Sequence, residues 1–144
     1  MKWPVRLAGI ALAVSAVAAG VFVTPQAALA RGGCADGEDP STFSTHRTVR
    51  SVRAASGALY ELRYDDVTQC AWGRISQGHS FDSFWVDRAA SLTEAYAGHW
   101  EPQLGYGLLT QGVTGAYTGA YNDSPQVMRA CGSSNGQIVC TQWF

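Results

Sequence analysis

The sequence predicts an all-β fold, a small single-domain β-sandwich or barrel of short antiparallel strands that is linked by disulfides. Apolar and polar residues alternate with a period of two in several short segments, as they do in half-buried strands. Turn residues separate these segments at short intervals, and no long helical periodicity interrupts them in residues 31–144. Short strands at such spacing are typical of sandwiches and small barrels.

The N-terminal region has the three parts of a secretory signal peptide. Lys2 and Arg6 form a positive start, residues 7–23 are uncharged and largely apolar, and residues 28–30 read Ala-Leu-Ala, a small-residue cleavage site. We therefore expect cleavage after Ala30 and a secreted, extracellular domain in residues 31–144. The alternative is a retained membrane anchor, because the apolar run approaches the length of a spanning helix.

Charge limits the classes of partner. Removal of residues 1–30 leaves eight arginines, no lysine and eleven acidic residues, a net charge of −3. Nucleic acid is disfavoured as the main partner, because phosphate binding needs a basic patch. We expect no contact with the membrane once the signal peptide is cleaved.

All four cysteines, Cys34, Cys70, Cys131 and Cys140, lie in the part that is predicted to be exported. An even number in a small exported chain predicts a disulfide framework. Three pairings are possible, and the sequence does not choose among them. We favour Cys131 with Cys140, closing a C-terminal hairpin, and Cys34 with Cys70, tying the N-terminal arm to the central strands. No Cys-x-x-Cys motif is present and no histidine lies at ligand spacing from a cysteine, so we expect no metal.

The central element is a predicted hairpin over residues 59–75. Residues 59–64 and 71–75 each alternate between two faces, as strands do. Asp65 and Asp66 separate the two strands, since both residue types suit turns.

The segments on either side of this hairpin are also predicted to be short. Residues 42–55 favour one strand with a solvated edge, and its three regularly spaced arginines (positions 47, 50 and 53) indicate a solvated face rather than an anion-binding stripe. Residues 81–89 predict a strand. Residues 91–98 predict at most a turn of helix, and an aromatic-rich loop is expected to begin at His99.

The C-terminal part combines a glycine-rich segment with a second hairpin. Residues 105–121 contain five glycines but lack the Lys-Ser/Thr of a phosphate-binding loop, so we expect an exposed, adaptable loop or a kinked strand pair. Residues 127–130 and 137–141 predict strands. The turn between them, over residues 133–136, contains Asn-Gly, a strong hairpin signal.

Five motifs run through the domain in a fixed order: Asp-Gly-Glu-Asp-Pro at 36–40, Glu-Leu-Arg-Tyr at 61–64, Trp-Gly-Arg-Ile at 72–75, Arg-Ala-Cys-Gly at 129–132 and Cys-Thr at 140–141. With these motifs the chain resembles the secreted actinobacterial family of unknown function catalogued as DUF2690. The resemblance implies a one-domain, β-rich exported protein and supplies no activity. The family usually has cysteines where this chain has Thr45 and Thr68.

No motif in the chain predicts catalysis. No Gly-x-Ser-x-Gly nucleophile elbow between a strand and a helix is predicted, His-Glu-x-x-His is absent, and the cysteines are expected to be oxidised. The run His99-Trp100-Glu101 suggests a fragment of a site or, more simply, a loop with a tryptophan. The acidic residues 36–39 do not follow the EF-hand pattern and predict a turn. We expect neither an enzyme nor a cofactor, and a small secreted hydrolase is kept as the second alternative.

Aromatic residues favour a binding function instead. Tyrosine and tryptophan offer a large contact area at low entropic cost. Trp72 and Trp85 lie on predicted strands and are expected in the core. The binding candidates are Trp100, Tyr106, Tyr117 and Tyr121, in or near the glycine-rich segment. We predict a non-enzymatic extracellular or cell-envelope recognition module, with a cell-wall glycan or a secreted protein as its partner. The first alternative is an inhibitor of secreted proteases that presents residues 105–121.

Overall fold

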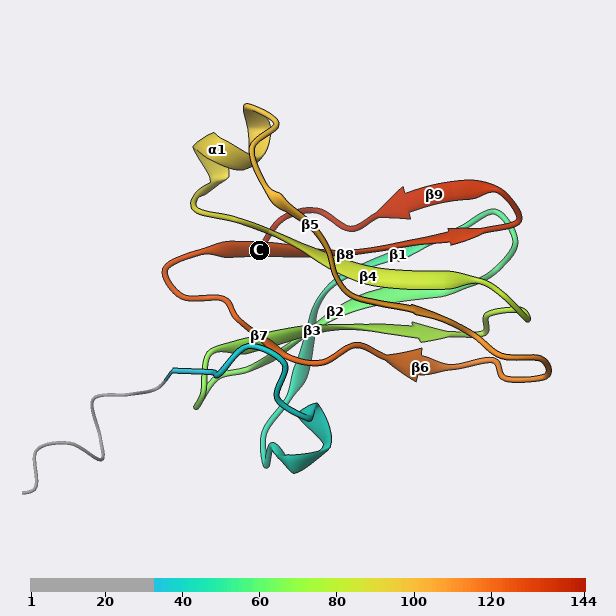
Figure 1. Ribbon diagram of the computed structural model, residues 1–144, viewed down its shortest axis with the longest axis horizontal. Coiled ribbons are helices and arrows are strands. Elements are labelled where there is room, and N and C mark those ends of the chain that lie inside the picture. Colours follow the sequence, from blue (N-terminus) through green and yellow to red (C-terminus); the bar gives the residue numbers. More distant parts are fainter. Residues whose placement is uncertain (1–32) are drawn as a thin grey trace, which may run out of the picture.

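Two antiparallel sheets pack face to face in the computed structural model, which describes residues 33–144 (Figure 1). The predicted all-β fold is confirmed as an open sandwich, since neither sheet closes into a barrel in this part of the chain. The predicted signal peptide and its cleavage after Ala30 lie outside the described residues.

Sheet I has the strand order β1-β2-β3-β6, and β7 also pairs with β3. These strands are β1 (Arg47–Arg53), β2 (Leu59–Asp65), β3 (Cys70–Ser76), β6 (Ala116–Tyr117) and β7 (Tyr121–Asn122). A short 3-10 helix, η1 (Pro40–Thr42), precedes β1, and the side chain of Asp39 accepts a hydrogen bond from the backbone of Ser41 at its start. We call residues 33–46 the N-terminal arm.

Sheet II has the order β5-β4-β8-β9. Its strands are β4 (Ser83–Ala89), β5 (Glu101–Leu108), β8 (Val127–Ser134) and β9 (Gln137–Cys140). The helix α1 (Leu92–Tyr96) connects β4 to β5 and begins at Ser91, whose hydroxyl accepts from the backbone N–H of Glu94. After β9 the chain continues along β8, because Phe144 and Met128 exchange both backbone hydrogen bonds.

The core lies between the two sheets and follows from the predicted alternation. Leu62 on β2 packs with Val86 on β4 and Met128 on β8, and the three side chains are fully buried. Trp72 and Trp85 are buried as expected, but on the outer faces of their sheets and not in the core between them. Every residue of β4 is buried, because the strand pairs on both edges and packs against sheet I.

Both favoured disulfides are present. Cys34 bonds to Cys70 and ties the N-terminal arm to β3, while Cys131 bonds to Cys140, its direct partner across β8 and β9. Two disulfides in a domain of this size are typical of an oxidising, extracellular environment. Among the described residues no helix has the length and apolar character needed to cross a membrane.

Thr45 and Thr68 also link the N-terminal arm to sheet I, although without a covalent bond. Both hydroxyl groups donate to the carboxylate of Asp65, at the end of β2. Asp65 is buried, and these hydrogen bonds oppose the effect of burial so that the pKa of its carboxyl group is lowered. Thr45 and Thr68 are therefore joined through one carboxylate.

Three predicted boundaries are wrong. The strand expected over residues 42–55 is shorter, because η1 and an extended arm occupy its start. The loop expected from His99 contains β5, which forms because it pairs with β4 through two register irregularities. The turn expected over residues 133–136 contracts to Asn135 and Gly136, both with positive φ, because β8 runs on to Ser134.

Gly132 on β8 provides the first test, because its hydrogen faces the ring of Tyr60 across the sandwich. A Cβ atom there would overlap both that ring and the carbonyl oxygen of Ser83. We expect Gly132→Ala to lower the free energy of unfolding by about 3 kcal/mol or to prevent folding, since neither neighbour can move cheaply. Chemical denaturation measures the change. The matched control is Gly33→Ala, whose Cβ meets nothing within 4 Å; equal stability of the two variants would contradict this packing.

Candidate functional site

The outer face of sheet II gathers aromatic and apolar side chains that sheet I does not cover. Trp85 and Asp87 alternate with Phe84 and Val86 along β4, so the first pair points outward and the second points into the core. Around the outward pair lie side chains from β5, β8 and β9, from the segments just before β4 and β5, and from the C-terminal tail. We call this surface the aromatic face; it is formed by Phe81, Trp85, Trp100, Tyr106, Leu108, Arg129, Ile138 and Trp143.

Arg129 organises one half of the aromatic face. The carbon atom Cζ of its guanidinium group lies 4.6 Å from the ring centres of both Trp100 and Trp143. Its Nε and Nη2 atoms donate to Oδ2 of Asp87, each at 2.9 Å. The Asp87 side chain is only 4% exposed, so the ion pair is largely desolvated. Contacts of this kind between arginine and aromatic rings are stronger where water is excluded.

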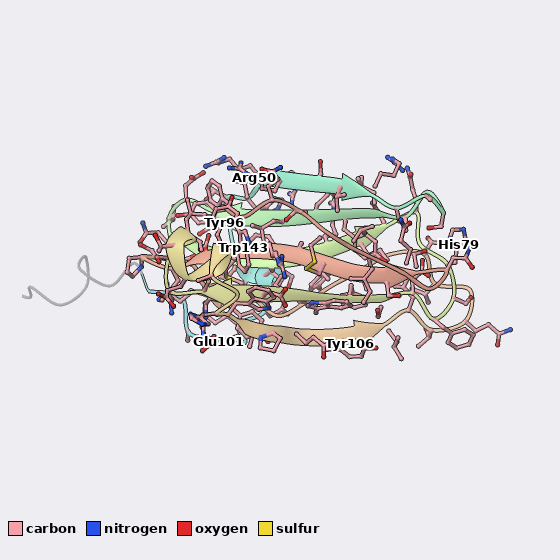
Figure 2. All side chains as sticks on the ribbon, turned by 90° about the horizontal axis from the view of Figure 1, so that it is seen from above. Arg50, His79, Tyr96, Glu101, Tyr106 and Trp143 are labelled. Atoms are coloured by element: carbon pink, nitrogen blue, oxygen red, sulfur yellow. A yellow bond between two sulfur atoms is a disulfide. The ribbon has the colours of Figure 1, made fainter. Side chains whose placement is uncertain are left out.

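Backbone hydrogen bonds hold two partners of Arg129, Asp87 and Trp100, in place. Gln103 has a φ of 55°, and from this position its backbone N–H donates to Oδ1 of Asp87 at 3.0 Å. Trp100 immediately precedes β5, and the residue before it, His99, donates its backbone N–H to the carbonyl of Glu94 on α1. Figure 2 shows Trp143 beside Tyr96 at the α1 end of the molecule, and both line the same hollow.

Tyr106 organises the other half. Its ring stacks on that of Trp85, with centres 6.0 Å apart and planes 28° apart. A hollow of about 460 Å³ adjoins this stack, and the exposed side chains of Phe81, Leu108 and Ile138 line it. Polar groups stand among these apolar ones, namely Asp82, Gln103, Ser133 and Asn135. The hollow therefore offers ring faces and hydrogen-bonding groups together.

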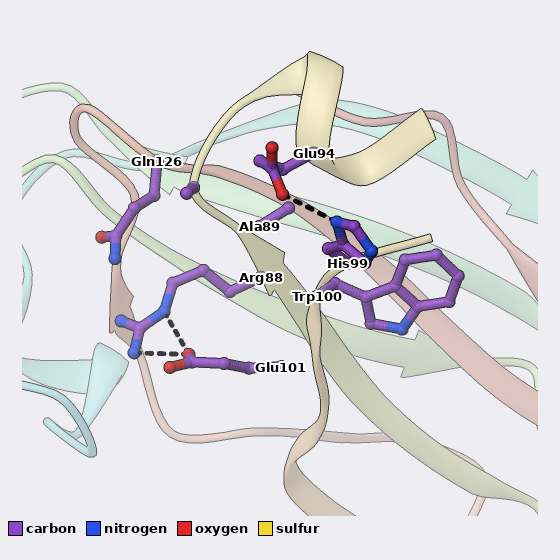
Figure 3. Close-up of a pocket in the computed structure, with 8 residues that line it drawn as sticks. Arg88, Ala89, Glu94, His99, Trp100, Glu101 and Gln126 are labelled. Atoms are coloured by element: carbon purple, nitrogen blue, oxygen red, sulfur yellow. Dashed lines mark hydrogen bonds and ion pairs between the residues drawn. The ribbon is translucent and has the colours of Figure 1, made fainter. Parts of the chain in front are cut away.

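A smaller hollow of about 290 Å³ lies beside Trp100 (Figure 3). Glu94 accepts from His99 at 2.9 Å, and Glu101 accepts from Nε of Arg88 at 2.8 Å. Arg88 also binds Asp36 through two hydrogen bonds of 2.8 Å, and it holds the pKa of the Asp36 carboxyl below its usual range. Both glutamates are well exposed and each faces a basic group, whereas the acid of a glycosidase commonly has an apolar environment.

The four binding candidates predicted from the sequence do not lie together. Trp100 and Tyr106 are on the aromatic face. Tyr117 is as exposed as Tyr106 but lies on the outer face of sheet I, next to Arg74. Tyr121 is half-buried and packs on the core, and burial raises the pKa of its hydroxyl group.

Several residues of the aromatic face have no signal in the sequence. Phe81 and Ile138 lie on predicted strands, and alternation alone does not say which face a second sheet covers. Leu108 lies in the glycine-rich segment that was predicted as a loop or a kinked strand pair. Arg129 and Trp143 had a partial signal. Arg129 lies in a predicted strand, and Trp143 closely follows the strand predicted to pair with it. The register of that hairpin was needed to place the two side chains together.

A second cluster, at the opposite end from α1, contains residue types found in hydrolases. His79 lies at that end (Figure 2), and its Nδ1 is 3.5 Å from Oδ2 of Asp82. Ser134 donates to the same oxygen at 2.8 Å and accepts from Ser56 at 2.6 Å. No hydroxyl group of the described residues bonds to the His79 ring, so this cluster lacks an activated nucleophile. It reads as a structural network around a buried carboxylate.

Potential metal ligands form two groups in the described part of the chain. Each consists of a disulfide and one carboxylate: Cys34 and Cys70 with Glu38, and Cys131 and Cys140 with Asp87. Oxidised cysteines do not supply the thiolates that zinc requires. Asp36 and Asp39, considered above for a calcium loop, bind Arg88 and the start of η1 instead.

Comparison with known proteins identifies no relative, since no family model, no curated protein and no solved structure matches the chain. The site has to be interpreted from its own geometry.

The pairing of Asp87 with Arg129 predicts a large stability effect. We expect Arg129→Met to lower the free energy of unfolding by about 3–5 kcal/mol, because it leaves a buried carboxylate without its cation. The double variant Asp87→Asn, Arg129→Met should recover much of that loss. Urea denaturation measures both. Arg47→Met, which breaks an exposed pair with Asp66, is the control and should change little; a loss as small for Arg129→Met would contradict the buried pair.

Asp123 predicts an unusual pH dependence. Burial raises the pKa of its carboxyl group to about 8, and Arg88 only partly opposes this. Between its ordinary value of 3.8 and about 8 the folded chain holds a proton that the unfolded chain has lost. The protonated Asp123 carboxyl group therefore contributes its full stabilisation below pH 3.8, and this contribution to the free energy of unfolding is lost as the pH rises through about 8.

Asp123→Asn removes the ionisable group. We expect the melting temperature of this variant to lie at least about 4 °C above that of the wild type at alkaline pH, and the difference to shrink toward pH 4. Calorimetry across that range measures it. A difference that stays constant with pH would show that Asp123 ionises normally in the folded protein.

Proposed function

We propose that this protein is a non-enzymatic extracellular recognition module that binds a cell-envelope glycan through the aromatic face. The observation that carries the proposal is the concentration of exposed apolar side chains on one face. Phe81, Tyr106, Leu108 and Ile138 are all more than half exposed, and they line one hollow. Large exposed apolar groups gathered in this way usually mark an interaction site.

The mixed character of the aromatic face favours a glycan as the ligand. Sugar rings have apolar faces that can stack on Trp100 and Tyr106, and hydroxyl groups that need hydrogen-bond partners. Asn135 and Gln103 line the same hollow as Tyr106 and can supply such partners. Asp87 already neutralises Arg129, so this part of the face has no strong demand for an anion.

The two alternatives receive less support. A hydrolase would need an activated nucleophile or an acid in an apolar environment. The buried carboxylate of Asp82 accepts hydrogen bonds from Ser134 and from the backbone of His79 instead, and Glu94 and Glu101 are exposed beside basic groups. A protease inhibitor would need a rigid exposed loop in residues 105–121. Part of that segment belongs to β5, and the exposed part contains Gly112 with a φ of 78°, a residue type that favours flexibility over preorganisation.

Secretion by a cleaved signal peptide belongs to the same proposal. The disulfides support an oxidising, extracellular environment, and the Ala-Leu-Ala sequence at residues 28–30 supports cleavage after Ala30. Membership of the secreted actinobacterial family named above also stays a proposal, which rests on the five sequence motifs.

Co-sedimentation of residues 31–144 with isolated cell-wall material tests the function. We expect the wild type to pellet and Tyr106→Ala to bind about fivefold more weakly, because it removes a stacking ring. Trp100→Ala should weaken binding in the same way. Val67→Ala is the control, since Val67 is also more than half exposed but lies in the turn between β2 and β3, outside the aromatic face.

Two results would contradict the proposal. Failure of the wild type to pellet would remove wall glycan as the ligand. Equal losses in Tyr106→Ala and Val67→Ala would show that the aromatic face is not the binding surface. Assays for proteolysis, protease inhibition and glycan turnover, run on the same samples, are expected to be negative.

A further inference from the structure

A second hollow lies on the opposite side of the sandwich, on the outer face of sheet I. It has a volume of about 150 Å³ and is lined by Pro40, Ser41, His46, Arg63, Trp72, Arg74 and Tyr117. Strand register explains why these side chains meet: Arg63 pairs with Trp72 across β2 and β3, and Arg74 pairs with Tyr117 across β3 and β6. The N-terminal arm closes one side. We call this site the basic hollow.

Hydrogen bonds in the basic hollow run in one direction, toward a single carboxylate. Nη1 of Arg63 donates to Thr48 at 2.5 Å, and the Thr48 hydroxyl donates onward to Oε1 of Glu61 at 2.8 Å. The other oxygen of Glu61 accepts from Nε of Arg74 at 2.7 Å. Both oxygens of Glu61 are therefore engaged, one by Thr48 and one by Arg74, and Arg63 reaches this carboxylate only through Thr48.

His46 contributes a donor rather than an acceptor. Nη2 of Arg63 lies 2.7 Å from Nδ1 of His46. Because a guanidinium group only donates, Nδ1 has to accept, and the neutral ring carries its proton on Nε2. The ring stands edge-on to Trp72, with centres 6.1 Å apart. Its Nε2–H group is thus available to a ligand.

Arg63 is left with an excess of positive charge. It has no carboxylate within ion-pair distance among the described residues, and it is half-buried, unlike the exposed Arg50 and Arg53. Partial burial and the nearby charge of Arg74 together lower its pKa. A desolvated cation beside a second cation is stabilised by a bound anion.

We propose that the basic hollow binds the oxyanion group of an organic molecule, with Arg63 as the principal donor and His46 and Arg74 beside it. The group is a carboxylate, a sulfate ester or a phosphate ester, and the carbon skeleton that bears it contacts Tyr117 and Pro40. An acidic sugar has both features. This site is independent of the aromatic face, and it assigns to Tyr117 a role that the proposed function does not use.

Titration followed by two-dimensional NMR of the side-chain N–H groups tests the proposal. The probes are glucuronate, glucose 6-phosphate, glucose 6-sulfate, uncharged glucose and inorganic phosphate, at low ionic strength because salt screens the interaction. We expect a saturable shift of the Arg63 Nε–H signal with the acidic sugars and none with glucose. Their relative affinities identify the preferred oxyanion.

Matched variants separate this site from general electrostatics. Arg63→Gln and Arg53→Gln remove the same charge from the same sheet, and within residues 33–144 the Arg53 side chain bonds only to Gly57 and Gln77. We expect Arg63→Gln to raise the dissociation constant at least about tenfold and Arg53→Gln less than about twofold. Tyr117→Ala should weaken the acidic sugars but not inorganic phosphate.

Three results would overturn the proposal: no saturable shift at millimolar concentrations, equal losses in the two arginine variants, or inorganic phosphate binding as tightly as the sugar phosphate. Binding of acidic sugars by a Tyr106→Ala variant is expected to be unchanged. That result keeps the fate of this site separate from the fate of the aromatic face.

Discussion

Strand β4 carries two adjacent charges although all seven of its residues are buried, and both charges have to be paired. Asp87 points outward and meets Arg129. Arg88 points the other way and meets Asp36 and Glu101. An unpaired buried charge costs several kcal/mol or more, so the fold is stable only when these partners are in place. They come from β8, from the N-terminal arm and from β5, and pairing the charges of one strand therefore positions three other segments.

The aromatic face is a consequence of the outward pair. Once Asp87 holds the guanidinium group of Arg129, the flat surface of that group is presented to Trp100 and Trp143, which contact it at equal distances. The Cys131–Cys140 disulfide and the continued pairing of the chain end with β8 fix the tail that bears Trp143. Side chains on strands with a fixed register lose little freedom on binding, which favours affinity.

Local patterns were enough to predict β2 and β3, because alternation of side chains is a property of a single strand. They were not enough for β5. Gly107 stands against the ring of Phe84, and Gly105 adopts a φ of 64° beside Thr118. In the sequence the same glycines indicate a loop, since the neighbours that require them lie elsewhere in the chain. The candidate site, too, could be predicted only in part. Residue type identified Trp100 as a binding candidate, but only the packing of the two sheets shows which strand faces stay uncovered.

The two outer faces repeat one motif, an arginine among aromatic rings, with opposite electrostatic outcomes. On sheet II the charge of Arg129 is cancelled by a carboxylate that is itself almost fully buried, and the surface that remains suits an uncharged ring. On sheet I the carboxylate of Glu61 is divided between Thr48 and Arg74, and Arg63 keeps its charge. The difference follows from where the acid lies. Asp87 is the direct cross-strand partner of Arg129, whereas Glu61 lies two residues from Arg63 on β2 and is the cross-strand partner of Arg74. In this way the two sides of one sandwich differ in charge: the aromatic face is locally neutral, and the basic hollow carries a positive charge.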